Sequence, residues 1–126
     1  VLSQKKARNL IPADGQVVKS IVSTNLIDEV AKAYGVELVE VLTGFKYIGQ
    51  QILKNETTGT GTYLFGMEES YGCLIGTYAR DKDAISATAA LCEAAAYYKE
   101  KGMTLWDDRH VREVRLLQGC REVHRP

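Results

Sequence analysis

Residues 17–35 read VVKSIVSTNLIDEVAKAYG and combine two different spacings of apolar residues. Residues 17–22 are mostly β-branched and predict a buried strand. Ser23, Thr24 and Asn25 can cap a helix over residues 26–34, and Gly35 is a typical helix stop. The apolar residues of that helix fall on one face: Leu26, Ile27, Val30, Ala31 and Tyr34. This stretch therefore predicts a strand followed by an amphipathic helix.

The same unit repeats directly afterwards. Residues 36–42 form a second β-prone run, and Thr43-Gly44 leads into a predicted helix over residues 45–54. We expect four apolar residues on one side of that helix: Phe45, Ile48, Ile52 and Leu53. Residues 55–62 are rich in Gly and Thr and predict a loop.

The remaining elements complete an α/β pattern. Residues 62–67 predict a third strand, and residues 74–78 predict a short fourth one. Asp81 or Asp83 then caps a long Ala-rich helix that runs to about Lys101 and is closed by Gly102. Strands alternating with helices predict a three-layer α/β/α sandwich on a mixed, mostly parallel sheet of about four strands.

Composition excludes several classes of function. The 126 residues suffice for one domain, and 16 basic against 16 acidic residues give no net charge. We therefore expect neither a nucleic-acid partner nor a membrane partner. No apolar run approaches a membrane span of about 20 residues, and the chain starts without a secretion leader, which predicts a cytoplasmic location. The three cysteines are far apart in sequence, which argues against a disulfide framework or a zinc site.

A compact group of polar residues follows the third predicted strand. Glu68, Glu69 and Ser70 lie between glycines, and the charged run 80–83 follows ten residues later. Carboxylates accept charge-assisted hydrogen bonds from neighbouring hydroxyls, so the loop suits a polyhydroxylated ligand. The run 80–83 offers Arg80, Lys82 and a helix N-terminus to a phosphate. The alternative is a solvated turn in which Lys82 pairs with a neighbouring aspartate.

These loops are expected at one edge of the sheet. Ligand sites in open α/β sheets gather beyond the carboxyl ends of the strands. Thr43-Gly44, the loop at 68–70 and the run 80–83 could all meet there.

Four stretches together resemble a known family. They are residues 22–26 (VSTNL), 41–49 (VLTGFKYIG), 63–72 (YLFGMEESYG) and 78–84 (YARDKDA). Residues 17–106 are similar to the third, sugar-recognition domain of the α-D-phosphohexomutases, the phosphoglucomutase and phosphomannomutase family.

The resemblance implies roles for particular residues. Glu68 and Ser70 would hydrogen-bond ring hydroxyls of a hexose phosphate, Lys82 would hold ligand phosphate or oxygen, and Thr43 would lie against the sugar. It implies no role for Glu69, and no catalytic or metal-ligating residue in this chain. Tyr71-Gly72 after the loop serine, and Leu42 before Thr43, favour a phosphoglucomutase over a phosphomannomutase.

The resemblance also implies a parent enzyme that interconverts hexose 1-phosphate and hexose 6-phosphate. Its Mg²⁺ and its hexose 1,6-bisphosphate intermediate would be bound with the help of other domains of the same chain. No stretch here resembles the phosphoserine loop or the magnesium loop, so we expect this chain to be inactive alone. A non-catalytic α/β binding or regulatory module of the same fold is the alternative.

The two ends depart from the family pattern. Residues 1–16 are interpreted as a leader from a preceding linker, and residues 107–126 as a non-family tail. Residues 113–119 read EVRLLQG, where family-like sequence would read Glu-Lys-Tyr-Gly-Tyr-Tyr-Lys. The codons GAG AAG TAC GGC TAC TAC AAG G for that peptide give Glu-Val-Arg-Leu-Leu-Gln-Gly when read from the third base. We therefore hypothesise an out-of-frame tail whose two histidines, His110 and His124, have no site role; a divergent basic helix is the alternative.

Overall fold

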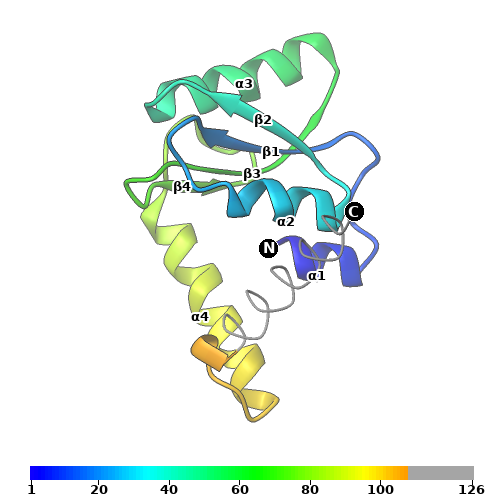
Figure 1. Cartoon of the computed structure of the whole chain (residues 1–126), viewed down its shortest axis with the longest axis vertical. Helices are drawn as coiled ribbons and strands as arrows, with labels where there is room; N and C mark the ends of the chain where they lie inside the picture. Colours follow the sequence, from blue (N-terminus) through cyan, green and yellow to red (C-terminus); the bar gives the residue numbers. More distant parts are fainter. Residues whose placement is uncertain (108–126) are drawn as a thin grey trace, which may run out of the picture. The chain divides into compact units, whose positions relative to one another are not determined.

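The computed structural model describes residues 1–107. The described residues divide into two units, of which the first covers residues 1–87 and the second begins at residue 88. The elements in chain order are α1 (Leu2–Ala7), β1 (Gly15–Ser20), α2 (Leu26–Tyr34), β2 (Glu37–Val41), α3 (Phe45–Thr58), β3 (Thr62–Met67), β4 (Cys73–Ile75) and α4 (Ala84–Glu100) (Figure 1).

The first unit is built on a four-stranded sheet of order β2-β1-β3-β4. Strand β1 pairs in parallel with both β2 and β3, and β4 runs antiparallel to β3. The prediction of a mixed, mostly parallel sheet is therefore confirmed.

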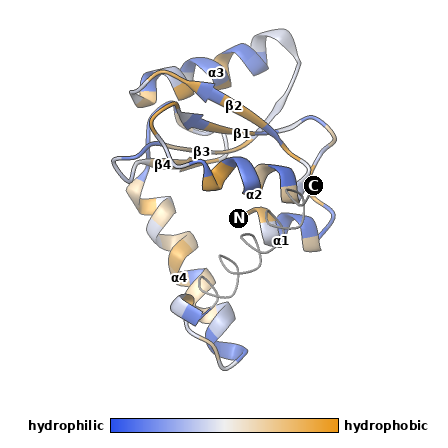
Figure 2. Ribbon diagram, viewed as in Figure 1, coloured by the Kyte–Doolittle hydropathy of each residue, from blue (hydrophilic) through white to orange (hydrophobic). Residues whose placement is uncertain are grey.

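Helices cover both faces of this sheet. Helix α3 packs on one face, where Phe45, Ile48 and Ile52 join Val18 of β1 in one apolar cluster. On the other face Ala31 of α2 packs with Val17 of β1, and Leu2 of α1 lies against the same cluster. Along α2 and α3 Figure 2 shows both hydrophobic and hydrophilic residues, as expected for helices with one apolar side. The three layers expected from the sequence are present.

A β-bulge shapes strand β3, which leads to the candidate site. The register between β1 and β3 shifts so that Gln16 faces Tyr63 and Val17 faces Phe65. The extra residue, Leu64, contacts the same cluster as Phe65. On the opposite face the Tyr63 hydroxyl donates to the Leu74 carbonyl at 3.0 Å, which ties β3 to β4. Burial is the main cause that raises the pKa of the Tyr63 phenol, so this donor stays protonated.

The prediction of a loop over residues 55–62 is wrong for its first half. Helix α3 continues to Thr58 and ends at Gly59, which is left-handed with φ of 66°. Asn55 is buried, and its side chain donates to the Gln16 amide oxygen at 2.7 Å. Because this contact joins α3 to β1, far away in the sequence, tertiary packing extends the helix where local propensity predicts a loop.

Other boundaries also differ from the prediction. The leader contains helix α1, and β1 begins at Gly15 rather than residue 17. Leu53 is 53% exposed, although the spacing placed it on the apolar side of α3. Strand β4 covers Cys73–Ile75 instead of residues 74–78.

A charged side chain is buried between α2 and β2. Lys19 of β1 is fully buried, and its Nζ lies 2.5 Å from Asp28 Oδ1 and 3.2 Å from Glu40 Oε1. Burial alone would lower the pKa of Lys19, but the hydrogen bonds and charges of these two carboxylates outweigh it and raise the pKa. The ammonium therefore stays charged inside the fold.

The second unit begins within helix α4. The helix ends at Glu100, and the left-handed Gly102, with φ of 70°, follows it as predicted. In Figure 2 this helix is pale to hydrophobic over most of its length, in keeping with its alanines. No helix in the described part of the chain is long and apolar enough to cross a membrane. The out-of-frame hypothesis concerns the tail from about Asp107 onward, which after Asp107 lies outside the described residues, and it stays a prediction.

Candidate functional site

Three adjacent strands end at the same edge of the sheet. Ser20 of β1 is in register with Val41 of β2, and Lys19 is in register with Met67 of β3. The Ile21 amide then donates to the Val41 carbonyl at 2.9 Å, which joins the loops after β1 and β2. The carboxyl ends of parallel strands thus place Thr43-Gly44 and the loop after β3 at one edge, as the sequence predicted.

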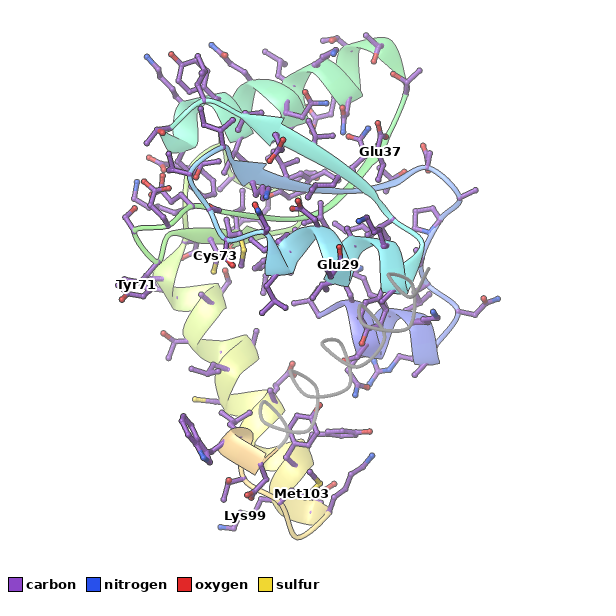
Figure 3. All side chains as sticks on the ribbon, viewed as in Figure 1. Glu29, Glu37, Tyr71, Cys73, Lys99 and Met103 are labelled. Atoms are coloured by element: carbon purple, nitrogen blue, oxygen red, sulfur yellow. The ribbon has the colours of Figure 1, made fainter. Side chains whose placement is uncertain are left out.

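The loop after β3 is a tight turn closed by its own backbone. The Glu68 amide donates to the Gly72 carbonyl at 2.9 Å. Tyr71 at the turn has φ of 68°, an uncommon conformation for a bulky residue, and is 99% exposed. Figure 3 shows it projecting from the outer side of the loop, whereas Cys73 lies at the start of β4.

Gly72 is required by close contacts rather than by its backbone angles. A Cβ at this position would lie 2.6 Å from Glu68 Oε1 and 2.7 Å from Lys82 Cδ. The glycine therefore lets these two side chains come together beside the loop.

Glu68, Ser70 and Lys82 form the centre of the site. The Glu68 side chain is only 8% exposed, and its Oε1 accepts a hydrogen bond from Ser70 Oγ at 2.9 Å. Lys82 Nζ lies 3.8 Å from the same oxygen. The structure thus brings together three of the four residues that the sequence singled out.

The Lys82 ammonium is shared among several neighbours. Its Nζ lies 3.3 Å from Asp81 Oδ1 and 5.7 Å from the centroid of the Phe45 ring. Its side chain is half-exposed, so the ammonium remains open to a ligand. Phe45 is the first residue of α3 and directly follows Thr43-Gly44. Lys82 thus connects the loop after β3 with the segment that carries the exposed Thr43.

Arg80 does not join this cluster. Its guanidinium binds Glu56 of α3 and donates to the Thr77 carbonyl at 2.7 Å. The expected pairing of Arg80 with Lys82 at one phosphate is therefore not found, and Lys82 is the basic residue of the candidate site.

A hollow of about 190 Å³ opens beside the loop. Its lining runs from the loop to the start of α4: Ser70, Tyr71, Gly72, Cys73, Lys82, Asp83, Ala84 and Ala87. Asp83 caps α4 by accepting from the Ile85 amide at 3.0 Å, as the sequence predicted. The hydrogen bond from Tyr78 is the main cause that lowers the pKa of Asp83, so the carboxylate stays charged.

Glu69 points to a different partner from Glu68. Its Oε2 accepts from Ser20 Oγ at 2.6 Å, and Ser20 Oγ lies 2.9 Å from Ser23 Oγ. Both serines are buried. The hydrogen bond from Ser20 is the main cause that lowers the pKa of the Glu69 carboxyl. Sequence reasoning assigned no role to Glu69 or to Ser20; the only available signal was a serine within the predicted strand 17–22 and a second one, Ser23, directly after it.

The sequence and the fold agree with known proteins. The sequence model described as phosphoglucomutase/phosphomannomutase, alpha/beta/alpha domain III, matches residues 1–111. The chain belongs to the phosphoglucomutase/phosphomannomutase family. The match includes α1 and the residues before β1, which the sequence interpretation had placed in a leader.

Individual relatives carry the same names. The chain is 39% identical over 115 residues to a phosphoglucomutase of Staphylococcus haemolyticus, an alignment that covers 91% of this chain and 19% of that protein. It is 41% identical over 92 residues to a phosphomannomutase of Mycoplasma genitalium, covering 72% of this chain and 16% of the relative. The chain therefore spans about a fifth or less of the length of these curated relatives.

A solved structure shares the fold of this family domain. The crystal structure of a putative phosphomannomutase from Thermus thermophilus superposes with a TM-score of 0.67 at 26% identity. The superposition covers 94% of this chain and 24% of that protein. The arrangement of strands and helices is thus that of one part of this larger protein.

The described residues do not fit a metal ion. Within residues 1–107 no group of three or more His, Cys, Asp or Glu side chains is placed to hold one. We therefore assign no step through Mg²⁺ to the residues of this domain.

Proposed function

We propose that this chain is the sugar-phosphate recognition domain of a phosphohexomutase that interconverts hexose 1-phosphate and hexose 6-phosphate. The observation that carries the proposal is the cluster of Glu68, Ser70 and Lys82, in which one nearly buried carboxylate meets a hydroxyl and an ammonium. Family membership and the names of the relatives support the reaction.

Each residue of the cluster has a distinct chemical task in this proposal. Glu68 accepts hydrogen bonds from ring hydroxyls, and Ser70 adds a hydroxyl beside it. Lys82 attracts the ligand phosphate or an oxygen near it. Thr43, exposed at the neighbouring strand end, lies against the sugar. These contacts bind and orient the hexose, and alignment is a large part of catalysis in phosphoryl transfer.

Hydrogen bonds to ring hydroxyls suit a substrate that must bind in two orientations. The proposed reaction transfers phosphate at position 1 and at position 6, and hydroxyls in the middle of the ring are available in both. Other domains of the same protein would supply the phosphoserine, the Mg²⁺ and the remaining contacts to hexose 1,6-bisphosphate. We accordingly propose that this chain is inactive alone and that the whole protein acts in the cytoplasm.

Glucose is the preferred sugar in this proposal. Support comes from Tyr71-Gly72 and Leu42, which depart from the phosphomannomutase-like pattern, and from the phosphoglucomutase of Staphylococcus haemolyticus. The phosphomannomutase of Mycoplasma genitalium is comparably similar, so the two substrates need to be compared directly.

The decisive experiment measures mutase activity of the full-length protein that carries this chain. Glucose 1-phosphate and mannose 1-phosphate are compared in the original protein, in Glu68→Gln, and in the control Glu93→Gln, which changes an exposed residue of α4. Removing a charge-assisted contact costs about 1.5–3 kcal/mol, so kcat/KM of Glu68→Gln should fall about ten- to a hundredfold. The control should keep the original rate.

Other outcomes would change the conclusion. Equal loss in both glutamine variants would indicate a general effect on the fold rather than sugar contact. A full-length protein without mutase activity on either sugar would contradict the proposal and favour the non-catalytic binding or regulatory module.

A further inference from the structure

The two adjacent carboxylates of the loop face different surroundings. Glu68 contacts Ser70 and Lys82, whereas Glu69 accepts a hydrogen bond from Ser20 at 2.6 Å. A carboxylate bound by a hydroxyl forms a short, strong hydrogen bond. Glu69 therefore has an attachment of its own that does not involve the proposed sugar contacts.

That attachment reaches into the core of the sheet. Ser20 is only 1% exposed and is the last residue of β1. It lies 2.9 Å from the buried Ser23, whose amide donates to the Ser20 carbonyl at 3.0 Å. The partner of Glu69 thus belongs to a buried turn with its own hydrogen bonds, and such a turn can support a loop in one geometry.

The same turn is joined to the segment that leads to Thr43. Ser20 is in register with Val41, and the Ile21 amide donates to the Val41 carbonyl at 2.9 Å. Val41 lies two residues before Thr43. Two hydrogen bonds, joined by the peptide link between Ser20 and Ile21, therefore connect the loop after β3, through the end of β1, to the end of β2.

We infer that Glu69 is a positioning residue that, through Ser20 and Ser23, holds the 68–72 loop at a fixed distance from the Thr43-Gly44 segment. This inference rests on the proposed function, because it assigns the spacing of the two parts of the sugar site to the Glu69 attachment. The two neighbouring carboxylates then have different roles: Glu68 faces the ligand side, and Glu69 anchors the loop.

The kinetic test uses the full-length protein and four variants: Ser20→Ala, Glu69→Ala, the double variant, and Glu69→Gln, which keeps an oxygen acceptor. Loss of the hydrogen bond should raise KM for glucose 1-phosphate and lower kcat/KM about three- to tenfold in Glu69→Ala and in Ser20→Ala. The double variant should be no worse than either single variant, because both remove the same contact. Glu69→Gln should recover most of the loss, whereas Glu68→Gln should not.

A second measurement does not depend on activity. The Glu68 amide is bonded to the Gly72 carbonyl, so its hydrogen exchange reports opening of the loop. After correction for intrinsic rates, Glu69→Ala should speed this exchange about three- to tenfold, and amides in α4 should serve as the internal control.

The outcomes separate the two proposals. An original protein without mutase activity, but with faster hydrogen exchange of the loop in Glu69→Ala, would contradict the proposed function and support the positioning role of Glu69. Normal activity and unchanged hydrogen exchange in Glu69→Ala, together with a large loss of kcat/KM in Glu68→Gln, would overturn only the positioning role of Glu69. Additive effects in the double variant would show that Ser20 and Glu69 act separately, which also overturns it.

Discussion

Removing both partners of Lys19 should destabilise the fold far more than removing Lys19 itself. The Lys19 side chain is fully buried, whereas the side chains of Asp28 and Glu40 are 32% and 51% exposed. In the double variant Asp28→Ala, Glu40→Ala the ammonium is left buried and uncompensated, which costs about 3–5 kcal/mol. In Lys19→Met the carboxylates that remain are partly hydrated, so the free energy of unfolding should change by about 1 kcal/mol or less.

The single variants divide this effect unequally. Glu40→Ala should cost about 0–1 kcal/mol, since the residue is half-exposed and Asp28 still holds the ammonium. Asp28→Ala should cost about 1–3 kcal/mol, because the remaining ion pair is the longer and more exposed one. Glu29→Ala is the matched control: it too removes an acid from the first turn of α2, but its partner Lys32 is 73% exposed.

The assay is urea unfolding of the chain followed by circular dichroism, with the pH as a second variable. Because the folded state raises the pKa of Lys19 above its ordinary value of 10.5, its contribution is complete below pH 10.5. It is lost as the pH rises through the folded pKa. A double variant that costs less than about 1.5 kcal/mol would refute the reasoning, since it would mean that the ammonium reaches water.

Two glycines should respond to alanine in opposite ways. In Gly72→Ala the new Cβ meets the flexible ends of Glu68 and Lys82, so mutase kcat/KM should fall at least about tenfold while urea unfolding changes little; unchanged kinetics would mean that the pair does not need its present spacing. In Gly49→Ala the Cβ would lie 2.5 Å from the Arg80 carbonyl oxygen, a backbone atom, so the free energy of unfolding should fall by about 1–3 kcal/mol. A loss below about 0.5 kcal/mol would indicate that the segment around Arg80 moves aside easily.

Local sequence signals correctly predicted the elements whose bounds depend on residues close together in the sequence. The bounds of α2 and β3 agree with the prediction because Leu26–Tyr34 has a clear apolar face and Thr62–Met67 is β-prone between turn residues. The end of α3 was missed because Asn55 binds Gln16, 39 residues away. A local window of sequence does not reveal a contact between α3 and β1. The same reason applies to helix α1, where Leu2 packs on the α2 side of the core.

The site shows the same limit at the scale of single side chains. Glu68 and Glu69 are identical in type and adjacent in sequence, so composition and spacing cannot distinguish their roles. The fold distinguishes them because they meet different partners: Lys82, which comes from the segment before α4, and Ser20, which ends a strand that precedes them by 49 residues. The resemblance to the phosphohexomutases singled out Glu68, Ser70 and Lys82 together, because it implies a ligand contact for each of them. The contact between Glu69 and Ser20 depends on β1 and β3 being neighbours in the sheet. It is the basis for the inference that Glu69 anchors the loop between two proposed sugar contacts.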